Sequence, residues 1–148
     1  MEFFPEIDVD ERQAEAIARG LYAVAKIDGV HERELALIAG FYADAGGSVK
    51  ALSELERREA IKPDELAAVL HEHDHRLLFV KSALLLAFAD GAVSAEEQKI
   101  ISGYAQALGI AGPDLARLEE GVKEYLLGQL SHLANVDAVR QVARKLKV

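Results

Sequence analysis

The chain has 148 residues, of which 51% are hydrophobic and 28% charged, and its formal net charge is −8. A single domain of this size buries enough apolar surface to fold without disulfides or a structural metal. The chain contains no cysteine, which excludes a disulfide scaffold, a cysteine nucleophile and a thiolate zinc site, and its negative charge disfavours non-specific binding to nucleic acid.

Strong helix formers dominate the sequence, with 25 alanines, 20 leucines and 16 glutamates. The absence of threonine and the presence of only three prolines argue against a β-sandwich or barrel. We therefore expect residues 1–148 to form one all-α domain, a bundle of seven to eight helices. In chain order, apolar periodicity and capping signals predict helices over about residues 9–27, 31–45, 48–61, 63 onward, 75–89, 94–108 and 113–130, and a basic helix over about 135–147.

The predicted helix over residues 75–89 is apolar on nearly all sides. A helix with so little polar surface belongs in the middle of a bundle, so we expect residues 77–88 to form the most buried helix. Asp74 directly precedes it and is a residue type that caps helix N-termini. A helix boundary is therefore predicted at Asp74.

The chain contains an internal repeat, in which residues of about 10–46 resemble residues of about 75–109. Each copy consists of a predicted helix, a short Asp-Gly turn and a second helix. We expect the two hairpins to pack around a pseudo-twofold axis and to bring both turns to one acidic pocket. With one gap, the equivalent pairs are Asp28 and Asp90, Gly29 and Gly91, Glu34 and Glu97, and Gly46 and Gly109.

The two aspartates, Asp28 and Asp90, need a physical reason, because a carboxylate at a helix C-terminus faces the negative end of the helix dipole at a cost of about 0.3–1 kcal/mol. One interpretation is local, since aspartate favours tight turns by accepting hydrogen bonds from nearby backbone N–H groups. The other is a cation site, in which the aspartates, Glu34 and Glu97 form an oxygen-rich pocket suited to Ca²⁺, Mg²⁺ or Mn²⁺. Glu97 also has a local interpretation as the return arm of a capping box that Ser94 opens. Basic residues that could relieve the repulsion instead are Lys26, Arg33 and Lys99.

The segment His71–His75 contains the pattern H-E-x-x-H. In zinc peptidases two histidines one helical turn apart bind the metal and the glutamate acts as the base, so a zinc hydrolase using His71, Glu72 and His75 is one alternative. That chemistry requires an uninterrupted helix through the segment, whereas Asp74 predicts a boundary within it. We expect no peptidase activity and interpret the segment as a polar junction between helices.

The stretch LLFVKSALLLAFADGAVSAEEQKIISGYAQALGI resembles the TerB-like family, which includes a tellurite-resistance protein and a domain of a DnaJ-type co-chaperone. The match lies in the apolar helix that ends in ADG, the following V-S-x-E-E and the ALGI helix end, and with the looser first copy it covers about residues 10–128. The resemblance implies an all-α, non-enzymatic domain of two helical hairpins. It also implies metal binding by acidic residues of the repeats, which are Asp28, Glu34, Asp90 and Glu97. Because the first turn is one residue shorter, Glu32 is an alternative to Glu34.

These observations lead to one functional hypothesis and one rival. The hypothesis is a cytoplasmic domain that binds a divalent cation (Ca²⁺, Mg²⁺, Mn²⁺ or Zn²⁺) or a protein partner in a stress response of the tellurite type. The rival is a metal-free scaffold that docks a basic partner, because residues 1–74 carry 17 acidic and 8 basic groups, a net charge of −9. No nucleic acid is expected as a partner. No membrane span is expected either, since the longest apolar stretch, residues 77–89, is shorter than the roughly 20 residues that a span needs.

Overall fold

The computed structural model describes residues 7–28, 32–88 and 93–130. Within these ranges the chain forms seven α-helices and one 3₁₀-helix and no strand, which confirms the all-α prediction. The expected basic helix over residues 135–147 lies outside the described residues. In chain order the elements are α1 (Glu11–Ala25), η1 (Lys26–Asp28), α2 (Glu32–Asp44), α3 (Val49–Arg57), α4 (Pro63–Val69), α5 (His73–Phe88), α6 (Ala95–Ala107) and α7 (Gly112–Leu130).

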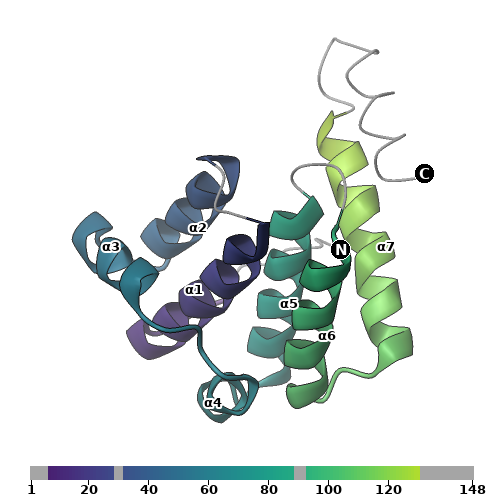
Figure 1. The fold of residues 1–148 in the computed structure, drawn as a ribbon, viewed down its shortest axis with the longest axis horizontal. Coiled ribbons are helices and arrows are strands. Elements are labelled where there is room, and N and C mark those ends of the chain that lie inside the picture. The colour runs from purple at the N-terminus through teal and green to yellow at the C-terminus, as the bar shows by residue number, and fades with distance from the viewer. Residues whose placement is uncertain (1–6, 29–31, 89–92, 131–148) are drawn as a thin grey trace.

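Helix α1 lies at the centre of the bundle and contacts α2, α3, α4, α5 and α6. Helices α5, α6 and α7 pack against one another and run in alternating directions, while α2 and α3 lie on the other side of α1 (Figure 1). Helix α4 contacts both α1 and α6. The described elements therefore form one helical bundle. Whether the pair α1 and α2 is related to the pair α5 and α6 by a twofold axis stays a prediction.

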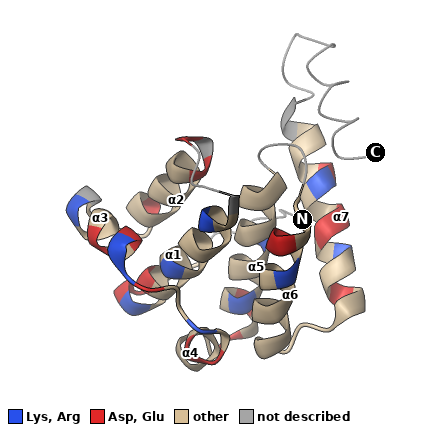
Figure 2. Ribbon diagram, viewed as in Figure 1, with Lys and Arg blue, Asp and Glu red and all other residues tan. Residues whose placement is uncertain are grey.

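The most enclosed helix is α1, and the prediction that residues 77–88 form it was wrong. Ten of the fifteen residues of α1 are buried, compared with eight of the sixteen in α5. Leu77, Leu78 and Leu85 of α5 are only partly buried against the core. The difference arises because α1 is rich in alanine and glycine, and small side chains let neighbouring helices come close on several sides. Charged residues are numerous along α3 and α7, whereas α5 carries few (Figure 2), yet α5 is not the most enclosed helix, so low charge did not indicate which helix is central.

Helices α1 and α5 approach each other closely at Gly20 and Phe79. A Cβ atom on Gly20 would lie 2.4 Å from the ring carbon Cε1 of Phe79, well inside van der Waals contact. The Phe79 ring is fully buried and meets the ring of Tyr104 edge-on, with the centroids 5.4 Å apart. The Tyr104 hydroxyl donates a hydrogen bond of 2.6 Å to the carbonyl of Ile61, and burial raises its pKa to about 12, so it remains a donor. This aromatic contact therefore holds α1, α5, α6 and the segment before α4 together.

The connection between α3 and α4 differs from the prediction that a helix continues to Ile61. Helix α3 ends at Arg57, and Arg58 is extended, with φ −75° and ψ 157°. Pro63 is the first residue of α4, and Lys62 before it is also extended, with φ −74° and ψ 149°. A proline disfavours the helical conformation in the residue that precedes it. The chain therefore straightens between the two helices, and Ile61 is buried.

Helices α2 and α6 end in the same way, at the two glycines that the repeat aligned. Gly46 has φ +88° and Gly109 has φ +78°, in the left-handed region that favours glycine. In both copies the N–H of the next residue donates a hydrogen bond of 2.8 Å to the carbonyl five residues earlier. This is the Schellman arrangement of a helix C-terminus, and it confirms that these glycines end both helices.

We expect Gly20→Ala to lower the free energy of unfolding by about 1–3 kcal/mol, the usual cost of overpacking a core. The added methyl group has to displace the buried ring of Phe79, and this cost exceeds the gain from replacing glycine in a helix. Denaturant unfolding followed by circular dichroism measures the change.

Gly40→Ala is the matched control, because Gly40 also lies within a helix but a Cβ atom there meets no atom within 4 Å. This change should raise the free energy of unfolding by about 0.5–1 kcal/mol. Combining Gly20→Ala with Phe79→Leu should recover part of the loss relative to the sum of the single changes. Similar effects at Gly20 and Gly40 would contradict the close helix contact.

Candidate functional site

The acidic residues of the two Asp-Gly turns are the first candidates for a functional site. Asp28 is the last residue of η1, and its side chain lies outside what the structure describes. Asp90 belongs to residues 89–92, which also lie outside the described residues. The positions of these two carboxylates therefore stay a prediction.

Glu34 and Glu97 are the two buried carboxylates among the described residues, with 3% and 6% of their surface exposed. Each lies in the first turn of the helix that follows an Asp-Gly turn, Glu34 in α2 and Glu97 in α6. Glu32, the alternative to Glu34, is exposed. Carboxylates are rarely buried unless they are paired, hydrogen-bonded or bound to a metal, so this shared burial needs an explanation in both hairpins.

Ser94 and Glu97 form the predicted capping box at the start of α6. The carboxylate oxygen Oε1 of Glu97 accepts a hydrogen bond of 3.0 Å from the N–H of Ser94, and Oγ of Ser94 accepts one of 3.1 Å from the N–H of Glu97. The local interpretation of Glu97 is therefore confirmed. In the first copy His31 stands where the second has Ser94.

The two turns start from the same side of the bundle. Helices α1 and α5 contact each other, and both end toward the top of the molecule as drawn in Figure 1. Asp28 follows the end of α1, and residues 89–92 follow the end of α5. A pocket shared by both turns requires an arrangement of this kind.

The described side chains alone do not form a metal site. No group of three or more histidine, aspartate or glutamate side chains suited to a metal ion occurs among them. Ca²⁺ takes six to eight oxygen ligands and Mg²⁺ an octahedral set that commonly includes waters, so Glu34 and Glu97 alone would be a sparse ligand set for such an ion. The predicted cation site also includes Asp28 and Asp90.

The segment His71–His75 does not form the helix that zinc binding requires. Helix α5 begins at His73, which leaves His71 outside any helix. Asp74, expected as the cap of this helix, lies in its first turn instead, where a negative charge interacts favourably with the helix dipole. The predicted interruption of the motif is confirmed, although it falls before His73 rather than at Asp74.

His75 has a structural role that engages both of its ring nitrogens. The side chain is buried, Nε2 lies 2.9 Å from the carbonyl oxygen of Asp8, and Nδ1 lies 3.3 Å from the amide nitrogen Nε2 of Gln13. These partners assign a ring that donates from Nε2 to the carbonyl and accepts at Nδ1. One sequence signal could have revealed this role, because His75 lies one helical turn before the buried Phe79.

Arg76 is an important residue that the sequence analysis missed. Its Nε donates to the carbonyl of Leu70 at 2.6 Å, its Nη1 to that of Leu108 at 3.1 Å and its Nη2 to that of Ala67 at 3.3 Å. These carbonyls lie at the C-terminal ends of α4 and α6, where a positive charge is favourable. No local pattern indicates this role, because one acceptor is 32 residues away.

Comparison with known proteins agrees with the resemblance in the sequence. The family described as tellurite resistance protein TerB matches residues 14–120, a range that extends from α1 into α7. A search of curated proteins and a search of solved structures each found no match. In the part of the chain that the structure describes, no helix is long and apolar enough to cross a membrane.

We expect His75→Ala to lower the free energy of unfolding by about 2–3 kcal/mol, because the change leaves the Asp8 carbonyl and the Gln13 amide without their buried partner. His71→Ala is the control, since His71 is exposed, and it should change the free energy by no more than about 0.5 kcal/mol. Thermal and denaturant unfolding of both variants measure the difference. Equal losses in the two variants would contradict the structural role of His75.

Proposed function

The chain belongs to the TerB family, and we propose that it is a non-enzymatic, tellurite-resistance-related domain that binds a divalent cation at its two Asp-Gly turns. The proposed ligands are the carboxylates of Asp28, Glu34, Asp90 and Glu97. The absence of cysteine suits a reducing compartment, and the proposal places the protein in the cytoplasm.

The observation that carries this proposal is the burial of Glu34 and Glu97 at equivalent positions of the two hairpins. Removing a carboxylate from water is costly unless a partner compensates for the lost hydration. The capping hydrogen bonds with Ser94 hold Glu97 in one orientation, as hydrogen bonds commonly do for metal-binding carboxylates. A divalent cation would be a shared partner for both glutamates, in addition to the interactions that each already makes.

The chemistry of the four carboxylates suits a hard cation. Oxygen ligands of this kind are preferred by Ca²⁺, Mg²⁺ and Mn²⁺, and Zn²⁺ also accepts carboxylates. Lys26 is a poor competitor for the role, because its ammonium group bonds the carbonyl of Glu56 and lies 5.9 Å from the centre of the Tyr22 ring. Lys99 is exposed. These observations favour an added cation over neutralisation by a neighbouring lysine.

The distribution of charge supports a second function, the docking of a basic partner. Residues 1–74 carry a net charge of −9, from 17 acidic and 8 basic groups, whereas residues 75–148 carry +1, from 8 and 9. Such a charge asymmetry attracts partners of opposite sign and raises their rate of association.

The cation proposal predicts a metal-dependent rise in melting temperature that depends on the two turns. Metal-stripped full-length protein is heated with CaCl₂, MgCl₂, MnCl₂ or ZnCl₂, and native mass spectrometry counts the bound ions. At a concentration 100 times the dissociation constant, the ion that binds should stabilise the fold by about 2.7 kcal/mol. The variant Asp28→Asn/Asp90→Asn should lose this rise, and without metal it should be at least as stable as the wild type, because repulsion between carboxylates is removed.

Asp44→Asn/Asp64→Asn is the matched control, since it makes the same change in charge at two exposed aspartates of α2 and α4. Its melting temperature should respond to metal as that of the wild type does. A metal response that is equal in the wild type and in Asp28→Asn/Asp90→Asn would defeat the proposal, as would the absence of a bound ion in every mass spectrum.

A further inference from the structure

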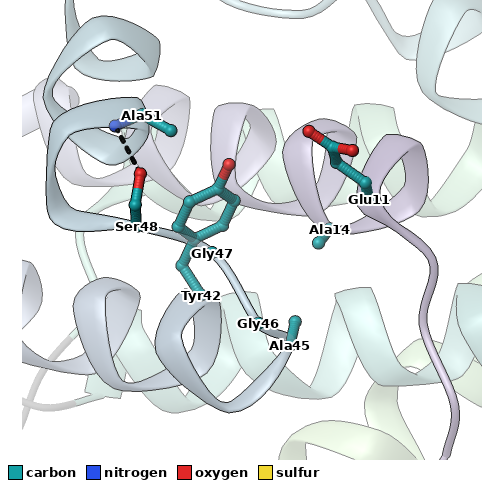
Figure 3. Close-up of a pocket in the computed structure, with 8 residues that line it drawn as sticks. All are labelled: Glu11, Ala14, Tyr42, Ala45, Gly46, Gly47, Ser48 and Ala51. Atoms are coloured by element: carbon teal, nitrogen blue, oxygen red, sulfur yellow. Dashed lines mark hydrogen bonds between the residues drawn. The ribbon is translucent and has the colours of Figure 1, made fainter.

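A cavity of about 270 Å³ lies between the start of α1 and the connection from α2 to α3. It is far along the chain from the Asp-Gly turns, because Glu11 is the first residue of α1 whereas Asp28 follows the last. Small and polar side chains form its walls, as Figure 3 shows: Glu11, Ala14, Tyr42, Ala45, Ser48 and Ala51.

Tyr42 presents a hydroxyl without a protein partner to this cavity. The residue is only 3% exposed, yet within the described part of the chain its hydroxyl forms no hydrogen bond. In Figure 3 the hydroxyl points to the same side of the cavity as the Glu11 carboxylate. Among the described residues Arg19 Nε is the only fully buried side-chain polar atom without a hydrogen-bond partner, so the Tyr42 oxygen is accessible at the cavity and can bond a group that enters from outside.

The turn after α2 fixes the position of the Tyr42 ring. A Cβ atom on Gly47 would lie 2.1 Å from the ring carbon Cε2, so the backbone passes directly against the ring. Gly46 provides the left-handed conformation, φ +88°, that this path requires. The hydroxyl is therefore held in place before any ligand arrives, which lowers the entropic cost of binding.

The carboxylates of Glu11, Glu15 and Glu54 act on the Tyr42 hydroxyl through their negative charge. Burial raises the pKa of Tyr42, and the negative charges of Glu15, Glu11 and Glu54 raise it further, in that order. The hydroxyl therefore remains protonated at neutral pH and can accept a hydrogen bond through its oxygen. Negative surroundings of this kind favour a cationic ligand and disfavour an anion.

We propose that this cavity binds the ammonium group of a lysine side chain from a basic partner protein. The ammonium would donate hydrogen bonds to the Tyr42 hydroxyl and the Glu11 carboxylate, and the three alanines would contact the methylene groups of the lysine, as apolar surfaces commonly do. A metal ion fits less well, because the described carboxylates and histidines form no group of three suited to one. Arginine also fits less well, because the Tyr42 ring lies against Gly47 and is almost fully buried, which leaves little aromatic face for a guanidinium to stack on.

A titration followed by nuclear magnetic resonance tests the proposal on the full-length protein. The probe is Nα-acetyl-lysine methylamide, and the control probe is the same compound with an acetylated ε-amine, which keeps the stem and removes the charge. The lysine probe should shift the amide signals of residues 45–51, and the acetylated probe should bind at least about tenfold more weakly. Equal binding of the two probes would overturn the proposal. Equal shifts with MgCl₂ at the same concentration would assign the cavity to an inorganic cation instead.

Two substitutions test the contacting groups. Tyr42→Phe removes only a hydroxyl that has no partner within the described chain, so the fold should be unchanged, and affinity for the lysine probe should fall about tenfold. Glu11→Gln should have a similar effect, whereas Glu96→Gln, at an exposed glutamate of α6, should have none. Wild-type affinity in Tyr42→Phe would overturn the proposal. The variant Asp28→Asn/Asp90→Asn should bind the probe normally, so the two proposed sites succeed or fail independently.

Discussion

The close approach of α1 and α5 at Gly20 and Phe79 is the constraint on which the rest of the bundle depends. Helices α2, α3 and α4 pack against α1, while α6 and α7 pack against α5, so this contact joins two groups of helices. The ring that fills the contact also meets Tyr104 of α6, whose hydroxyl reaches the carbonyl of Ile61. The absence of a side chain at Gly20 therefore sets how closely α1 and α5 pack, and contacts of α6 with α1 and α4 also join the two groups.

The same contact relates the fold to both proposed sites. Because α1 and α5 are held together along their length and end on one side of the bundle, the two Asp-Gly turns start from neighbouring positions. The cavity beside Tyr42 lies at the opposite end of α1. Helix α1 therefore separates the cavity beside Tyr42, at its first residue, from Asp28, which follows its last turn.

Local signals in the sequence predicted most helix boundaries, whereas features that depend on distant residues could not be predicted. Ser94 with Glu97 and the glycines at positions 46 and 109 act on backbone groups within a few residues. Their spacing in the sequence was therefore enough to predict where α6 begins and where α2 and α6 end. The end of α3 was misplaced, since the helix ends at Arg57 rather than Ile61, and Pro63 explains only the extended conformation of Lys62 directly before it. The greater burial of α1 follows from which helices surround it, and periodicity within one helix carries no such information.

The sequence indicated some residues of the candidate sites and missed others. The repeat aligned Glu34 with Glu97, and both are buried, whereas their role as metal ligands stays a prediction. It gave no indication of Tyr42, whose environment arises from α1, α2 and α3 together. The roles of His75 and Arg76 were missed for the same reason, since their partners are distant in the sequence.

The guanidinium of Arg76 also links two helix ends that are distant in the sequence. It binds carbonyls at the ends of α4 and α6 at the same time, and it is partly buried. A positive charge in such a place is favourable only when its acceptors are present. The stability of the two helix ends is therefore coupled through one side chain of α5, because moving either end away removes hydrogen bonds from the same charged group.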